Sequence, residues 1–214
     1  MSAELVIDLL HEAAYGTLAT HSTSAPGYPY ATVVPYVTDA AHRPVLCLSA
    51  LAEHTRNLLA DPRASLSVLQ PGAADVQTAS RLTLLGEAER IEPDGGLRAR
   101  YLRYAPNTEA LLSLDFHFYR LNPRRVRYIA GFGRMGWVEQ AELDALPGLD
   151  AGVEADLLAT LATQVPDGVC VLGLDACGID LAVGGQRVRE RFAERPLQPE
   201  AIAGAARDIL ARPR

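Results

Sequence analysis

The segment over residues 49–69 constrains the fold most, because a short helix, an enforced stop and a strand follow one another within it. At its start, side chains recur at helical spacing and predict an amphipathic helix; they are Leu51, Thr55, Leu58 and Leu59. Pro62 ends this helix, because proline disfavours the α conformation in the residue before it. Leu66 and Val68 then alternate with serines, which is the period of a half-buried strand.

Short strands with interspersed helices account for the chain up to about residue 138. Strands are expected over residues 15–21, 28–37, 44–48, 81–92 and 116–130, the last as two strands that meet near Asn122 and Pro123. Helices are expected over residues 3–14 and 94–112, the second one broken at Pro106. Such a series fits a small β-barrel.

A change of composition near Pro147 and Gly148 marks a domain boundary. Beyond it, helices over residues 152–163 and 199–211 alternate with short strands, which is typical of a small α+β unit. We therefore predict an α+β, mainly β chain, with a barrel domain over residues 1–138 and a C-terminal α+β domain over residues 147–214.

Composition excludes several classes of function. Every basic residue is an arginine, so a Schiff-base lysine and a P-loop lysine are both impossible. The net charge of −6 and the scattered arginines argue against nucleic-acid binding. No apolar run approaches the roughly 20 residues that cross a bilayer, and the first residues lack a secretory pattern. We expect a cytoplasmic protein with no nucleic-acid or membrane partner.

The histidines and cysteines predict no metal centre and no disulfide framework. The spacings of the five histidines match no metal-binding signature, which leaves open only a site assembled from residues far apart in the sequence. His11 is expected at the surface, on the polar flank of the first helix. The three widely spaced cysteines are expected to be buried thiols. No nucleophile elbow is present, so no catalytic residue is assigned and a cofactor is expected to carry any chemistry.

The start of the helix within residues 49–69 carries polar side chains that together suit an anion. They are Ser49, His54, Thr55, Arg56 and Asn57. Free backbone amides and the positive end of the helix dipole favour a phosphate at such a place. Glu53 opposes an anion, and the alternative interpretation is a solvated helix face.

Four segments resemble the pyridoxamine 5′-phosphate oxidase-like flavoproteins. They cover residues 16–20 (GTLAT), 28–36 (YPYATVVPY), 49–69 and 81–90 (RLTLLGEAER). The pattern Ser-x-Leu-Ala-x-His-Thr-x-Asn-Leu before Asp-Pro-Arg-x-Ser-Leu is similar to the haem iron utilisation (HugZ-type) branch, and so is the segment from Gly131 to Trp137. The resemblance covers about the first two-thirds of the chain.

This resemblance implies a split β-barrel that forms a homodimer and binds FMN at the dimer interface. The cofactor-binding residues that it implies are Thr32, Val33, Val34, Tyr36, Ser49, His54, Thr55, Asn57 and Arg81. The residues from Ser49 onward would hold the FMN phosphate. The strand that contains Thr32 would run along the flavin, and Arg81 would add a polar contact.

Two departures from the family pattern bear on function. Glu53 and His54 stand where the oxidases usually have basic residues. The Met-Asn-x-Asp-His motif of the haem-utilisation C-terminal domain has no counterpart over residues 154–164, and no histidine follows His117. These absences argue against haem ligation by the C-terminal domain and against oxidation of pyridoxamine phosphate.

Three functions remain open at this point. The first is an FMN-dependent oxidoreductase that acts on a small molecule. The second is a haem-binding or haem-degrading protein that does not need FMN. The third is a dimeric scaffold without flavin and without enzymatic activity.

Overall fold

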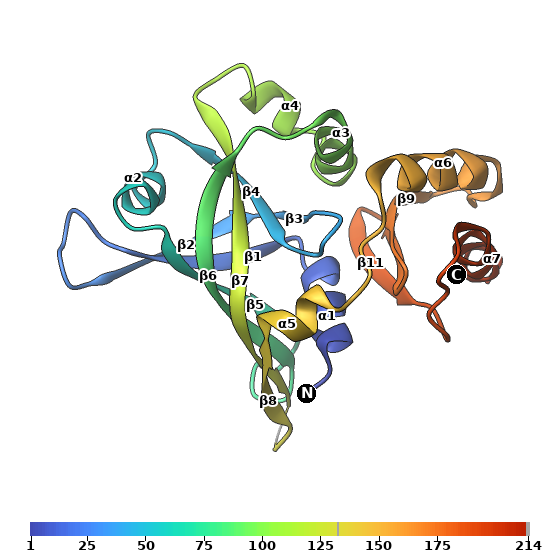
Figure 1. Ribbon diagram of the computed structural model, residues 1–214, viewed down its shortest axis with the longest axis horizontal. Helices are drawn as coiled ribbons and strands as arrows, with labels where there is room; N and C mark the ends of the chain where they lie inside the picture. The colour runs from blue at the N-terminus through green and yellow to red at the C-terminus, as the bar shows by residue number, and fades with distance from the viewer. Residues whose placement is uncertain (132, 213–214) are drawn as a thin grey trace.

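The computed structural model describes residues 1–131 and 133–212; Phe132, part of the segment from Gly131 to Trp137, lies outside them. Figure 1 shows a curled sheet surrounded by helices, with a smaller module beside it. We call the larger part the barrel. Its elements are α1 (Ala3–Glu12), β1 (Tyr15–His21), β2 (Pro29–Pro35), β3 (Val37–Thr38), β4 (Pro44–Ser49), α2 (Glu53–Ala60), β5 (Arg63–Leu69), β6 (Ser80–Ile91), α3 (Gly95–Tyr104), α4 (Thr108–Leu111), β7 (Phe116–Ala130), β8 (Met135–Glu139) and α5 (Gln140–Asp144).

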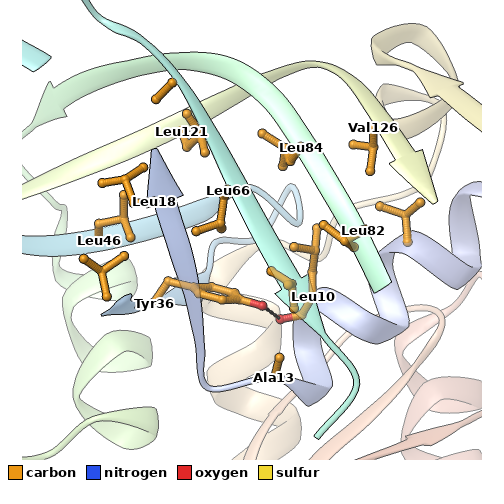
Figure 2. Packing of buried hydrophobic residues seen from close by; sticks show 14 of the residues in the cluster. Leu10, Ala13, Leu18, Tyr36, Leu46, Leu66, Leu82, Leu84, Leu121 and Val126 are labelled. Atoms are coloured by element: carbon orange, nitrogen blue, oxygen red, sulfur yellow. Dashed lines mark hydrogen bonds between the residues drawn. The ribbon is translucent and has the colours of Figure 1, made fainter. Parts of the chain in front are cut away.

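The barrel is one antiparallel sheet with the strand order β2-β1-β5-β6-β7-β4-β3, and β8 pairs with β7. Apolar side chains from the inner face of the curled sheet pack into one core, and α1 closes it (Figure 2). Across this core the Tyr36 hydroxyl donates a hydrogen bond of 2.9 Å to the carbonyl of Leu10. In β5, Leu66 and Val68 point inward as their alternation predicted. This architecture confirms the predicted split β-barrel of the α+β class.

Strand β7 is continuous over 15 residues, so the prediction of two strands there was wrong. Its pairing with β6 shifts register between Leu85 and Gly86, beside Pro123. A bulge of this kind accommodates a proline, which cannot donate to the ladder. Gly86 is required at this position, because a Cβ there would lie 2.3 Å from the carbonyl oxygen of Asn122.

Helix α2 packs through a narrower face than the sequence predicted. Thr55 and Leu58 are buried, whereas Leu51 and Leu59 are 76% and 68% exposed. The prediction of one helical side formed by Leu51, Thr55, Leu58 and Leu59 was therefore wrong in part, because Leu51 precedes the helix and Leu59 is exposed. The helix rests on β1 through a polar contact, in which the Asn57 amide donates to the Thr20 hydroxyl at 3.0 Å.

The C-terminal module is a three-stranded antiparallel sheet with two helices. Its elements are α6 (Ala151–Leu161), a 3-10 turn (Ala162–Gln164), β9 (Val169–Leu174), β10 (Gly178–Val183), β11 (Gln186–Arg191) and α7 (Pro199–Leu210). The strand order is β11-β10-β9, and the apolar side chains of α6 and α7 pack with those of the sheet into a separate core. In Figure 1 the module lies beside α1 and α3 of the barrel.

Charged side chains join the module to the barrel. Asp180 of β10 is fully buried and accepts a hydrogen bond from the His11 ring of α1 at 2.7 Å. Arg189 of β11 contacts both Asp180 and Asp175, and Arg100 of α3 pairs with Glu154 of α6. His11 is only 1% exposed, so its prediction as a surface residue was wrong. The module covers the polar flank of α1 that the helical pattern assigned to solvent.

Cys47 and Cys177 are buried as expected, whereas Cys170 on the edge strand β9 is exposed, so that part of the prediction was wrong. Within residues 1–131 and 133–212, no helix combines the length and the hydropathy that a bilayer crossing requires.

Candidate functional site

The start of α2 offers backbone donors but few free side chains. The residue that precedes the helix, Ala52, provides no side-chain cap, which leaves first-turn amides available to an anion. The Ser49 hydroxyl accepts from the Leu51 amide and keeps its own proton for donation. The Thr55 hydroxyl instead donates to the Ser49 carbonyl at 2.7 Å.

The side chain of Asn57 also makes hydrogen bonds within the protein. Its side-chain oxygen accepts from the amide and hydroxyl of Thr23, and its nitrogen donates to Thr20. These bonds tie the β1–β2 hairpin to α2, so the side chain of Asn57 positions the predicted anchor.

His54 and Glu53 flank the first turn of α2 and act in opposite directions on an anion. His54 is half-buried, and burial lowers the pKa of its imidazole. Glu53 accepts a hydrogen bond from the Ser24 hydroxyl of the β1–β2 loop. A phosphate at this place would therefore be held by backbone amides, Ser49 and His54.

The predicted flavin-lining residues of β2 divide between the two faces of the sheet. Val33 is 64% exposed on the outer face, while Val34 is buried. Thr32 pairs with Leu18 and shares the inner face with it. Tyr36 lies beyond β2 in the barrel core, where burial raises the pKa of its phenol.

Arg81 lies apart from the other predicted residues within one chain. It belongs to β6, and both β5 and β1 separate that strand from β2. Its guanidinium donates to backbone carbonyls of the β5–β6 loop, including that of Val76 at 2.7 Å. Within one chain, α2, which carries His54, therefore lies near β1 and β2, whereas two strands separate Arg81 from β2.

A groove on the outer face of the sheet carries a group of residues that the sequence reasoning missed. We call it the outer groove. It has a volume of about 390 Å³ and is lined by Ala19, Thr20, His21, Pro29, Arg63, Ala64, Ser65, Leu85, Gly86, Glu87 and Arg124. Strand register explains this grouping, because Ala19 pairs with both Ala31 and Ser65, and Ser65 pairs with Leu85.

The outer groove combines an imidazole, two guanidinium groups and an apolar floor. His21 ends β1 and is exposed. Arg63 makes hydrogen bonds of 2.9 and 3.1 Å from Nε to the carboxylate of Asp61, and these bonds lower the pKa of Asp61. Arg124 approaches Glu87 at 3.2 Å. The period of two along β1, which places His21 on the face of Thr17 and Ala19, was a usable signal for this site.

The outer face continues from the groove toward β8 as an exposed surface. The Arg125 guanidinium lies 4.0 Å from the ring centroid of Trp137, and that of Arg127 lies 5.5 Å away. Tyr15 on β1 is 65% exposed and Trp137 is 40% exposed. Aromatic and aliphatic side chains in such positions mark a surface suited to a partner or a flat ligand.

The barrel corresponds to a known family. Residues 3–130 match the family model of pyridoxamine 5′-phosphate oxidase. The chain belongs to the pyridoxamine 5′-phosphate oxidase family. The resemblance found in the sequence is thereby confirmed, and the oxidase-family match covers the whole sheet up to the end of β7.

Three similar proteins carry names that concern haem. Non-canonical heme oxygenase HOZ of Arabidopsis thaliana is 34% identical over 130 residues, which are 60% of this chain and 40% of that protein. Heme oxygenase HutZ of Vibrio cholerae is 28% identical over 144 residues, 64% of this chain and 81% of that protein. A heme binding protein from Mycobacterium smegmatis has a solved structure with 31% identity and a TM-score of 0.65, covering 99% of this chain and 96% of that one.

Proposed function

We propose that this protein binds haem in the outer groove and serves haem iron utilisation. The observation that carries the proposal is the exposed imidazole of His21 in a groove that two arginines, Arg63 and Arg124, and the apolar side chains of Ala19 and Leu85 also line. Haem needs an apolar surface for its macrocycle, a ligand for its iron and cationic partners for its two carboxylates. The haem-related names of three relatives support this choice.

Six residues of the groove have distinct parts in this proposal. His21 would bind the iron through its imidazole, and Ala19, Pro29 and Leu85 would contact the macrocycle. Arg63 and Arg124 would pair with the carboxylates. When bound, haem supplies redox chemistry at iron, while the chain fixes its position and limits the access of water.

The same proposal includes a homodimer formed through the outer face. Tyr15 and Val33 are about two-thirds exposed on this face, and Trp137 adds an aromatic surface at its far side. A second copy would remove these side chains from water and enclose the groove. Light scattering after size-exclusion chromatography measures the mass directly, and a monomer at micromolar concentration would contradict this part of the proposal.

Haem titration of the purified full-length chain tests the groove. We expect a saturable change of the Soret absorption, and His21→Ala should weaken haem binding by at least about tenfold, because outer partners of metal ligands alone contribute that much. His117→Ala is the matched control, since His117 lies on β7 against Arg90 and does not line the groove. Equal affinity of the His21→Ala variant and the wild type would refute the assignment.

FMN binding at α2 is a second candidate function, favoured by the uncapped first turn beside Ser49 and His54. If bound, the flavin would supply electron transfer to a small molecule. Changing Ser49 and His54 together to Ala should weaken FMN binding by tenfold or more, because hydrogen bonds to a charged group contribute about 1.5–3 kcal/mol each. Fluorescence quenching of FMN measures this, with Thr55→Ser as the control that keeps the internal hydroxyl. Absence of FMN uptake by the wild type would remove this candidate.

A further inference from the structure

Two histidines and an aspartate that are distant in sequence meet in the contact between the barrel and the C-terminal module. His11 comes from α1, His42 from the β3–β4 loop and Asp175 from the turn between β9 and β10. All three are buried, and one ligand atom from each lies within 4.8 Å of the other two. Two imidazoles and one carboxylate are a common donor set for divalent transition metals.

The orientation of His11 suits metal binding through its Nε2 atom. Its Nδ1 atom lies 2.7 Å from Oδ2 of Asp180, a carboxylate that is fully buried. Metal-bound histidines usually donate their other ring N–H to a carboxylate in this way, which fixes the ring and its tautomer. The Nε2 atom of His11 then faces Nδ1 of His42 at 3.0 Å.

His42 is held rigidly and keeps one ring nitrogen without a partner. It is 5% exposed, and its Nε2 atom is buried with no hydrogen-bond partner among the described residues. Its backbone has φ of 62°, a left-handed conformation that costs energy for a residue other than glycine. The buried ring of His42 presents Nδ1 to the Nε2 atom of His11, and its Nε2 atom would carry the proton in the metal-bound form.

Asp175 keeps lone pairs on its Oδ2 atom beyond the one that accepts from Arg189. Its Oδ1 atom accepts from the amides of Cys177 and Gly178 and from Arg189, whereas Oδ2 accepts only from Arg189, at 2.8 Å. The Oδ2 atom also lies 3.8 Å from the Nδ1 atom of His11. Arg189 therefore fixes the orientation of the Asp175 carboxylate, and Asp180 fixes that of the His11 ring.

We propose that His11, His42 and Asp175 bind one divalent transition metal ion, of the class of Zn²⁺, Co²⁺ or Fe²⁺, that links the barrel to the C-terminal module. His11 Nε2, His42 Nδ1 and Asp175 Oδ2 are the ligands. Tetrahedral sites with metal–nitrogen bonds of 2.0–2.1 Å place the two nitrogens about 3.3 Å apart. The observed 3.0 Å needs to open by only a few tenths of an ångström.

Metal binding would not change the number of protons on the imidazole rings of His11 and His42. With Nδ1–H of His11 donated to Asp180, its Nε2 accepts the Nδ1–H of His42. Metal binding then requires the proton of His42 to move from Nδ1 to Nε2, and no net proton is released. The site is independent of the outer groove, because none of its three ligands lines that groove.

Cobalt is the most informative probe, because Co²⁺ in a tetrahedral N/O site absorbs visible light. The full-length chain, without a polyhistidine tag, is produced in minimal medium with added Co²⁺ and purified. We expect about one cobalt per chain by elemental mass spectrometry, together with the visible absorption of the bound ion. Zn²⁺ added in excess should remove that absorption.

Variants separate this site from adventitious binding. His42→Ala and Asp175→Asn should lower cobalt occupancy at least tenfold, while His117→Ala, which changes a histidine outside the cluster, should retain it. Circular dichroism confirms that each variant is folded. Wild-type protein that is folded but metal-free, or His42→Ala with unchanged occupancy, would overturn the proposal. The wild-type measurement decides alone if either variant fails to fold.

Discussion

Replacing Arg189 with Met tests the argument that buried charges hold the C-terminal module to the barrel. The Arg189 side chain is 2% exposed and lies within 2.9 Å of two carboxylates, those of Asp175 and Asp180. Those carboxylates are themselves 5% and 0% exposed. Methionine would fill most of the volume but would leave two buried anions without their cation.

The expected loss of stability follows from this geometry. Burial alone would raise the pKa of Asp180, but the His11 ring and Arg189 hold the pKa below its ordinary value, so the carboxylate is ionised in the folded protein. Removal of one partner from a buried ion pair typically costs about 3–5 kcal/mol. We therefore expect Arg189→Met to lower the free energy of unfolding by about 3–5 kcal/mol.

Urea denaturation followed by circular dichroism measures this free energy. Arg212→Met is the matched control, because Arg212 is 57% exposed and lies 3.7 Å from Glu190 at the surface. A surface pair of this kind contributes at most about 1 kcal/mol. A loss below about 1 kcal/mol for Arg189→Met, or a loss equal to that of the control, would refute the reasoning.

Two further predictions concern the barrel core and the thiols. Tyr36→Phe removes the 2.9 Å hydrogen bond to the Leu10 carbonyl and should cost about 1 kcal/mol in the same denaturation assay, with an unchanged value counting against that bond. Cys170 should react with a thiol reagent in the native protein between pH 7 and 9, while Cys47 stays protected because burial raises its pKa to about 11, which keeps it a protonated thiol in that range. Mass spectrometry after labelling gives the modified positions, and labelling of Cys47 as fast as Cys170 would contradict this explanation.

Local patterns were enough to predict most of the barrel. Alternation through Leu66 and Val68 identified the inner face of β5, and Pro62 ended α2 as expected. The continuity of β7 could not be read in the same way, because Pro123 interrupts a strand unless a bulge accommodates it. The register shift skips Arg124 of β7, and Gly86, from a distant part of the sequence, leaves space for the backbone at Asn122.

The candidate sites were harder to predict because their contacts, too, come from residues far apart in the sequence. His11 has the pattern of a surface residue on its own helix, and it is buried by contacts with Asp180 of the C-terminal module and His42 of the β3–β4 loop. The period of two along β1 places His21 on the outer face, but the groove also needs Arg63 and Leu85, which reach it through strand pairing. The anion site at the start of α2 was predicted from local residues, but the bonds of Asn57 depend on the β1–β2 hairpin and that of Thr55 on the carbonyl of Ser49.

The position of α1 near the start of the chain has a consequence for the order in which parts of the protein fold during synthesis. His11 leaves the ribosome long before its hydrogen-bond partner Asp180, which follows 169 residues later. Until then Asp8 and His11 face water or other parts of the nascent chain. The barrel can therefore assemble early around the apolar side of α1, but its opposite side reaches its final surroundings only after most of the chain has been translated.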